Sequence, residues 1–223
     1  MLKVIYEDNH LLVVEKPVNI LSQGDDTNDK DMVNLLKSYV KEKYNKPGNV
    51  YIGLVHRLDR PVGGVMVFAK TSKAASRLSE QVRNKSFKKT YRAVIHGKMN
   101  KNKDTLNDYL YKNKKTNMVS VVNKNHKDAK AAELSYETLG FKENKSLVEI
   151  DLKTGRSHQI RVQFSSRKHP LFGDQRYGQD VNKLGQQISL WSYRINIIHP
   201  TTKEKMEFIC PPPQEYPWNL FKF

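Results

Sequence analysis

Apolar and polar positions alternate at both ends of the chain in a pattern that predicts β-hairpins. The stretch LKVIYEDNHLLVVEKP, residues 2–17, has two runs of aliphatic and β-branched residues separated by Glu-Asp-Asn and ended by a proline. Residues 187–213 have two similar runs around a Pro-Thr-Thr-Lys turn and end in three prolines. We therefore expect one hairpin near each end of the chain.

Strand-like runs also occupy the middle of the chain. They lie at residues 65–69, 88–97, 132–140 and 146–155. The first is a short apolar run typical of a buried strand, whereas the last two alternate and indicate an antiparallel pair. Residues 155–164, GRSHQIRVQF, fit either a strand or a short helix, because their periodicity is ambiguous.

Two segments have the apolar spacing of an amphipathic helix. The first starts after Asp31 as N-cap and places on one face Met32, Leu35, Leu36, Tyr39 and Val40. The second starts after Thr71, ends near Asn84 and places on one face Ala74, Ala75, Leu78 and Val82. Since strands outnumber helices and do not alternate regularly with them, the pattern predicts an α+β fold with a largely antiparallel sheet.

Net charge narrows the class of partner. The chain has 39 Lys and Arg against 23 Asp and Glu, a formal net charge of +16, which attracts polyanions and favours nucleic acid. A generally basic proteome would give the same excess, so charge alone leaves both readings open. Residues 98–130 contain nine lysines against three aspartates, and we expect there a mobile or hairpin insertion that is either solvated or contacts phosphates.

Several classes of protein are excluded. Cys210 is the only cysteine, which rules out an intrachain disulfide and a cysteine-cluster metal site and fits a cytoplasmic protein. No glycine-rich phosphate loop is present, and the histidines lack metal-type spacing, so we expect no metal and no nucleotide cofactor. The N-terminus has no signal core and no apolar run could span a bilayer, so we expect no membrane association.

One charge cluster stands out against this background. Asp59 lies between Arg57 and Arg60 and is followed by a proline and two glycines, which fit a tight turn before the strand at 65–69. An ordinary surface cluster and a catalytic carboxylate are both consistent with these residues alone.

Three stretches of the chain together resemble the signature segments of the RluA-type pseudouridine synthases. They are HRLDRPVGGVMVFAK at 56–70, KKTYRAVIHG at 88–97 and GRSHQIRVQF at 155–164, and VVEKP at 13–17 resembles the family's opening strand and turn. The resemblance covers nearly the whole chain. It implies the pseudouridine synthase fold, in which a mixed, largely antiparallel central sheet has a catalytic cleft and flanking helices, and the isomerisation of uridine in RNA without a cofactor.

The resemblance also implies roles for individual residues. Asp59 matches the family's essential aspartate, and Arg161 matches the arginine that pairs with it and keeps it ionised. Tyr91 matches the active-site tyrosine that stacks on uracil, and Ile160 the aliphatic wall opposite. Arg57 resembles the arginine that enters the RNA stack in place of the flipped uridine.

Other residues of the same segments are expected to contact the substrate. They are His56, Arg60, Arg156, His158 and Gln159. Lys16 and Pro17 are expected to shape the rim of the cleft. The chain departs from the family at Val62 and Gly63, where threonine and serine are usual, which puts local hydrogen bonding near the aspartate in doubt.

The expected protein is a single catalytic domain over residues 1–223, monomeric, with the lysine-rich insertion near 98–130 and no separate N-terminal RNA-binding module. Its expected substrate is a specific uridine in rRNA or tRNA. The alternative is a noncatalytic RNA-binding or ribosome-assembly protein that keeps the synthase fold. A nuclease is disfavoured because clustered carboxylates for Mg²⁺ are missing from the sequence.

Overall fold

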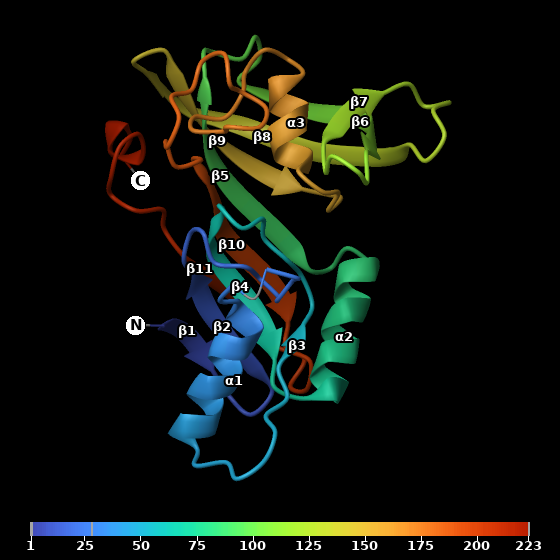
Figure 1. The fold of residues 1–223 in the computed structure, drawn as a ribbon, viewed down its shortest axis with the longest axis vertical. Coiled ribbons are helices and arrows are strands. Elements are labelled where there is room, and N and C mark those ends of the chain that lie inside the picture. The colour runs from blue at the N-terminus through green and yellow to red at the C-terminus, as the bar shows by residue number, and fades with distance from the viewer. Residues whose placement is uncertain (1, 28, 223) are drawn as a thin grey trace. The chain divides into compact units, whose positions relative to one another are not determined.

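The chain folds into two compact units. The structure is a computed structural model and describes residues 2–27 and 29–222. One unit comprises residues 1–89 and 192–211, and the other comprises residues 90–191 and 212–223. Figure 1 shows the helices and strands along the chain. No helix within the described ranges is both long and apolar enough to cross a membrane.

The first unit is built on an antiparallel sheet. Its strands are β1 (Lys3–Glu7), β2 (Leu11–Lys16), β3 (Gly53–Leu54), β4 (Gly63–Ala69), β10 (Leu190–Ile198) and β11 (Lys205–Ile209). They follow the order β1-β2-β4-β10, with β3 beside β4 and β11 beside β10. Every residue of β4 is buried, as the apolar run predicts. The antiparallel pairs β1·β2 and β10·β11 confirm the two predicted hairpins.

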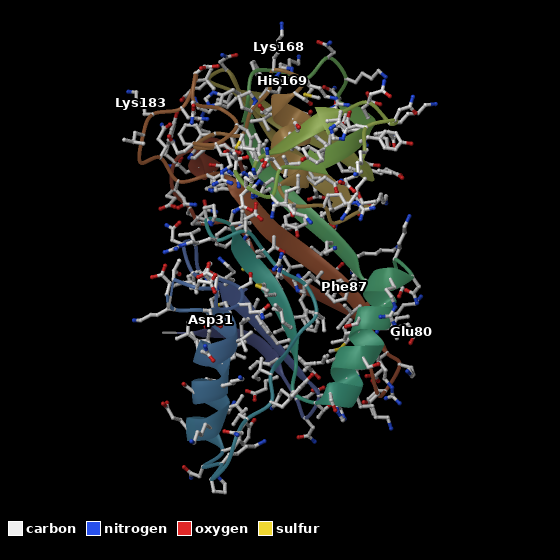
Figure 2. The ribbon with its side chains drawn as sticks, turned by 45° about the vertical axis from the view of Figure 1, so that its right-hand side comes forward. Asp31, Glu80, Phe87, Lys168, His169 and Lys183 are labelled. Atoms are coloured by element: carbon white, nitrogen blue, oxygen red, sulfur yellow. The ribbon has the colours of Figure 1, made fainter. Side chains whose placement is uncertain are left out.

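Two helices belong to the first unit, α1 (Met32–Lys43) and α2 (Ser72–Arg83). The Asp31 side chain caps α1 by accepting from the backbone N–H of Asn34 at 3.1 Å, and Figure 2 labels Asp31 at the start of that helix. Thr71 caps α2 in the same way. Both predicted N-caps are confirmed, and each removes an unpaired donor from the first helical turn.

The buried faces of these helices are narrower than predicted, since Leu35, Tyr39, Ala75 and Val82 are not buried. Leu35 is 38% exposed, because the buried stripe of α1 is the narrower row of Met32, Leu36 and Val40. In α2 the buried residue is Gln81 rather than Val82. The Gln81 side chain donates to the carbonyl of Ile198 at 2.7 Å and accepts from its N–H at 2.9 Å, so its burial leaves no polar atom of the amide unsatisfied.

The second unit contains antiparallel strands and one α-helix. Its strands are β5 (Lys88–His96), β6 (Lys103–Lys112), β7 (Val119–Val122), β8 (Lys130–Lys142) and β9 (Lys145–Leu152), in the order β5-β9-β8-β6-β7. Helix α3 (Gln159–Ser165) lies on one face of this sheet, and a short 3-10 helix spans Trp218–Leu220 (Figure 1). The α+β class and the largely antiparallel sheet are confirmed.

The ambiguous segment 155–164 contains most of α3. Its first six helical residues are all buried, polar ones included, so no solvent-facing stripe gives it a helical period. Val162 packs in a cluster with Leu110 of β6, Val119 of β7 and Ala132 of β8. That contact fixes the helix against the sheet.

Candidate functional site

The loop that carries Asp59 is a turn held at its end by a close backbone contact. The N–H of Val62 donates to the carbonyl of Asp59 at 2.9 Å, and β4 begins directly afterwards. Gly64 has a φ of +115°, and a Cβ there would stand 2.3 Å from the carbonyl oxygen of Ser192 in β10. Only glycine fits that position, and the contact therefore fixes the point at which the loop with the half-buried Asp59 joins β4.

Two side chains from earlier in the chain hold this loop by hydrogen bonds to its backbone. The hydroxyl of Ser22 donates to the carbonyl of Leu58 at 2.8 Å and accepts from its N–H at 3.0 Å. The Lys16 ammonium donates to the carbonyls of Pro17, Arg60 and Val62 at 2.9, 3.0 and 2.8 Å. Residues on both sides of Asp59 are therefore tied to β2 and the segment after it.

Lys16 is completely buried instead of standing at a cleft rim. Its three N–H groups meet three carbonyl oxygens, which is the arrangement that lets an ammonium leave water. Burial lowers the pKa of Lys16 to about 7, and the negative charge of Asp59 acts in the opposite direction. The lysine thus supports the aspartate's loop by hydrogen bonds.

We expect replacing Lys16 by methionine to lower the free energy of unfolding by about 2 kcal/mol or more, because buried carbonyls left without a donor cost about 1–3 kcal/mol each. Urea unfolding measures the loss. Lys73→Met is the matched control, since Lys73 is exposed on α2 and its loss should change stability little.

The stability difference between the wild type and Lys16→Met should also depend on pH. The unfolded chain keeps the ordinary lysine pKa of 10.5, whereas the folded pKa is about 7, so between these values the unfolded state binds the extra proton. The Lys16 contribution to stability therefore rises with pH across that window. A difference that is the same at pH 6.5 and pH 9.5 would show that Lys16 stays charged in the folded protein.

The other predicted residues of this loop have different surroundings. Arg57 and Arg60 are exposed, and Arg60 forms an ion pair with Asp29 at 2.7 Å. His56 is buried, and its Nε2 accepts from the N–H of Val67 at 3.0 Å. Its ring lies 5.2 Å from that of Phe87, which Figure 2 labels after the end of α2. Burial lowers the pKa of His56 to about 3, so it is neutral at pH 7 and packs within the unit.

The remaining predicted residues belong to the second unit. Tyr91 lies on β5, opposite Ile150 of β9, and is 6% exposed. Ile160 and Arg161 lie in the first turn of α3 and are 5% and 6% exposed. The structure thus describes the predicted site as two groups of residues, one in each unit, and the joint action of the groups stays a prediction.

Arg161 forms a buried ion pair that the sequence analysis missed. Its Nε and Nη2 donate to the two carboxylate oxygens of Asp174, both at 2.8 Å, and its guanidinium lies 5.2 Å from the centre of the Tyr177 ring. Burial alone would raise the pKa of Asp174, but hydrogen bonds and charge from Arg161, together with the N–H groups of Arg176 and Tyr177, lower it. Both partners are therefore ionised, and the planar guanidinium is fixed in orientation.

Gln159 holds the segment in front of α3. Its Oε1 accepts from the Thr154 hydroxyl at 2.8 Å and the Arg156 N–H at 3.1 Å, and its Nε2 donates to Glu133 and Gln163. These four bonds occupy the whole amide. The side chain therefore shapes the loop at 154–158 from within.

Arg156 and His158 each make a side-chain contact at this loop. The Arg156 side chain is exposed, and its Nε donates to the carbonyl of Ala131 at 2.9 Å. His158 has a positive φ of 51°, unusual for a side chain with a Cβ, and its Nδ1 lies 2.7 Å from the Tyr177 hydroxyl. A strained residue held by its neighbours is typical of functional loops.

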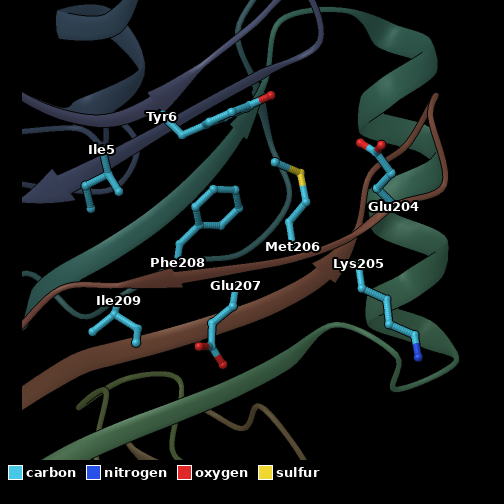
Figure 3. Close-up of a pocket in the computed structure, with 8 residues that line it drawn as sticks. All are labelled: Ile5, Tyr6, Glu204, Lys205, Met206, Glu207, Phe208 and Ile209. Carbon is cyan, nitrogen blue, oxygen red and sulfur yellow. The ribbon is translucent and has the colours of Figure 1, made fainter.

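An open groove lies elsewhere in the first unit, between β1 and β11. It is lined by Ile5 and Tyr6 and by residues 204–209, as Figure 3 shows, and the rings of Tyr6 and Phe208 are 5.5 Å apart. None of these residues belongs to the predicted site. Within residues 2–27 and 29–222, no cluster of three or more His, Cys, Asp or Glu side chains is arranged to hold a metal ion.

Comparison with known proteins places these features in a family. The family model described as RNA pseudouridylate synthase matches residues 10–166. An uncharacterized RNA pseudouridine synthase of Bacillus subtilis is 33% identical over 215 residues, which cover 96% of this chain and 70% of that one. The ribosomal large subunit pseudouridine synthase C of Buchnera aphidicola (Schizaphis graminum) is 32% identical over 219 residues, 93% of this chain and 66% of that one.

A solved structure has a similar fold. The human RNA pseudouridylate synthase domain containing 4 aligns with a TM-score of 0.82 over 98% of this chain and 91% of that one, at 20% sequence identity. This likeness concerns the fold, whereas the family match and the sequence identities of about one third concern descent. The chain spans about two thirds of the length of these bacterial relatives. It belongs to the RluA family of RNA pseudouridine synthases, which are isomerases that act on RNA.

Proposed function

We propose that this chain converts one specific uridine of rRNA or tRNA into pseudouridine, with Asp59 as the reacting carboxylate. The observation that carries the proposal is the family match over residues 10–166, which includes the Asp59 loop, β5 and the start of α3. Three of the relatives are named ribosomal large subunit pseudouridine synthases, which makes rRNA the first substrate to examine.

The reaction sets the demands on the site. The bond between the ribose and nitrogen 1 of uracil breaks, the base turns, and the ribose bonds to carbon 5. Carbon 5 then loses its proton and nitrogen 1 gains one, so no atom is added or removed. In our proposal Asp59 acts at the ribose or abstracts a proton, and this role requires its ionised form.

The second unit supplies the remaining roles in this proposal. Arg161 acts beside Asp59 as the positively charged partner, and its bidentate bond with Asp174 presets the orientation of the guanidinium. Tyr91 and Ile160 flank the flipped uracil, and Arg57 takes the place of the uridine in the RNA stack. Gln159 and His56 act as positioning residues, because their polar contacts are internal and both are buried.

The direct test is incubation of the purified chain with total RNA from a cell that lacks its own synthases, followed by mapping of pseudouridine at single-nucleotide resolution. We expect one new site or a small set of sites, and none in a reaction without protein. Absence of any new site across salt, magnesium and RNA-folding conditions would contradict the proposal. It would favour the noncatalytic RNA-binding alternative, which requires binding without turnover.

A further inference from the structure

The two faces of strand β6 have different surroundings: one is packed against α3 and the other is not. Leu110 is buried in the cluster with Val162 of α3. Since successive residues of a strand point to opposite faces, Tyr109 and Tyr111 lie on the face away from α3. Tyr109 is 40% exposed and Tyr111 is half-buried.

The neighbours of these two rings across the sheet have small side chains. Tyr109 pairs with Val122 of β7 and Ala131 of β8, and Tyr111 pairs with Ser120. All three are small side chains. The ring of His126, from the turn between β7 and β8, lies 4.5 Å from that of Tyr111. Two strand residues span about 7 Å, so Tyr109 and Tyr111 form a short row of aromatic rings.

Ordered turns surround this row. The turn at 113–118 is held by the Asn113 side chain, which accepts from the N–H groups of Lys115 and Thr116. The turn at 123–129 is held by Asn123, whose side chain accepts from the N–H of Asn125. We call residues 107–131, which contain the row and both turns, the arm.

The arm carries a concentrated positive charge. It contains six lysines, all exposed: Lys112, Lys114, Lys115, Lys124, Lys127 and Lys130. Its two acidic residues are Asp108, which pairs with Arg167 at 2.9 Å, and Asp128. In the part of the chain that the structure describes, none of the six lysines forms an ion pair. Lys112 follows Tyr111 on the strand and Lys130 pairs with Leu110, so both point to the α3 face. The four turn lysines are Lys114, Lys115, Lys124 and Lys127, and their charge is available to a polyanion beside the tyrosine row.

We propose that the arm is an RNA-binding surface separate from the reacting site, where Tyr109 and Tyr111 stack on unpaired bases and the four turn lysines contact phosphates. Aromatic rings beside unpaired lysines match single-stranded nucleic acid, whose bases and phosphates alternate along the chain. An acidic protein would satisfy the lysines but would give the exposed rings no flat partner. The inference rests on the proposed function, since it assigns the RNA of that reaction to the arm.

The sheet order sets how far along the RNA this contact lies. Three strand spacings, about 14 Å, separate β6 from β5, which carries Tyr91. Arg156, in the loop at 154–158, donates to the carbonyl of Ala131, the residue opposite Tyr109. The arm therefore engages nucleotides a few positions from the flipped uridine, and its base is joined to the loop before α3.

Binding of labelled RNA to the full-length chain tests the proposal. The probes are a single-stranded oligouridylate of about 20 nucleotides and an RNA duplex of about the same length, measured by fluorescence anisotropy. We expect Tyr109→Ala/Tyr111→Ala to weaken single-strand binding about tenfold or more, because each stacked base contributes about 1–3 kcal/mol. The duplex, whose bases are already stacked, should lose less than about twofold by the same reasoning.

Matched variants separate stacking from folding and from charge. Tyr109→Phe/Tyr111→Phe keeps both rings and should bind as the wild type, and Tyr51→Ala removes a comparably exposed ring, 48%, from the first unit without effect. Changing the four turn lysines to glutamine should weaken the binding of both probes. The slope of the logarithm of the binding constant against the logarithm of the salt concentration should become shallower by about 0.7 for each phosphate that is no longer neutralised. Thermal unfolding checks that each variant is folded. If Tyr109→Ala/Tyr111→Ala does not fold, the single variant Tyr109→Ser replaces it.

Three results would overturn the inference. The first is single-strand binding by the alanine variant equal to that of the wild type, and the second is an equal loss for single strand and duplex. The third is binding of an acidic protein in place of either RNA. These readouts do not depend on turnover. If the wild type forms no pseudouridine, the proposed function fails while the binding result stands. If the wild type forms pseudouridine but the arm variants bind RNA normally, only the inference about the arm fails.

Discussion

Replacing Asp59 by asparagine should reduce pseudouridine formation by about a thousandfold or more while leaving the fold and RNA binding intact, because the amide can neither attack the ribose nor accept its proton. The side chain is nearly isosteric and half-buried on a turn that is held by backbone bonds and by Lys16. The loop should therefore keep its shape. Single-turnover assays on the mapped RNA, with anisotropy for binding, measure both quantities.

The control for this variant is Asp26→Asn, which removes an exposed carboxylate from a polar loop of the same unit. It should keep full activity. If Asp59→Asn retained turnover within about tenfold of the wild type, the carboxylate would not be the reacting group. If it lost RNA binding and turnover together, Asp59 would be a binding residue and the noncatalytic alternative would gain support.

The local features of the fold were predictable from sequence because short-range chemistry determines them. Asp31 and Thr71 cap helices through bonds to residues only three positions away. The buried strand β4 is visible as a continuous apolar run. The turn after Asp59 follows from the glycines, since the positive φ of Gly64 suits no other residue there.

The features that escaped prediction depend on distant partners. Gln81 is buried in place of Val82 only because the backbone of Ile198 offers it both a donor and an acceptor, 117 residues away in sequence. Lys16 is buried because the carbonyls of residues 60 and 62 surround it. Nothing in the alternation of apolar and polar residues reports such long-range hydrogen bonds.

Asp174 could have been suspected from one signal. A helix with an arginine among apolar and amide side chains, such as IRVQF, needs a carboxylate to neutralise the buried guanidinium. Asp174 stands in the apolar LFGD sequence only 13 residues later. The resemblance directed Arg161 to Asp59 alone, so this second carboxylate received no role.

The buried pair of Arg161 and Asp174 provides the other large effect. Asp174→Ala should lower the free energy of unfolding by about 3–5 kcal/mol, because it removes the bidentate carboxylate partner of a buried guanidinium and leaves two N–H groups without an acceptor. Urea unfolding followed by circular dichroism measures the loss. The surface pair of Lys103 and Glu137 is the matched control, and Glu137→Ala should change stability by less than about 1 kcal/mol.

A double variant separates the pair from its surroundings. Most of the cost of each single variant arises because one charge of the buried pair loses its partner in the other. The double variant Arg161→Met/Asp174→Leu should therefore lose less free energy of unfolding than its two single variants added together, and the coupling energy should exceed about 1 kcal/mol. Additive effects would mean that the two side chains stabilise the unit independently. A loss for Asp174→Ala no larger than that for Glu137→Ala would mean that water reaches the guanidinium, and a guanidinium so hydrated could not hold the fixed orientation on which its proposed role beside Asp59 depends.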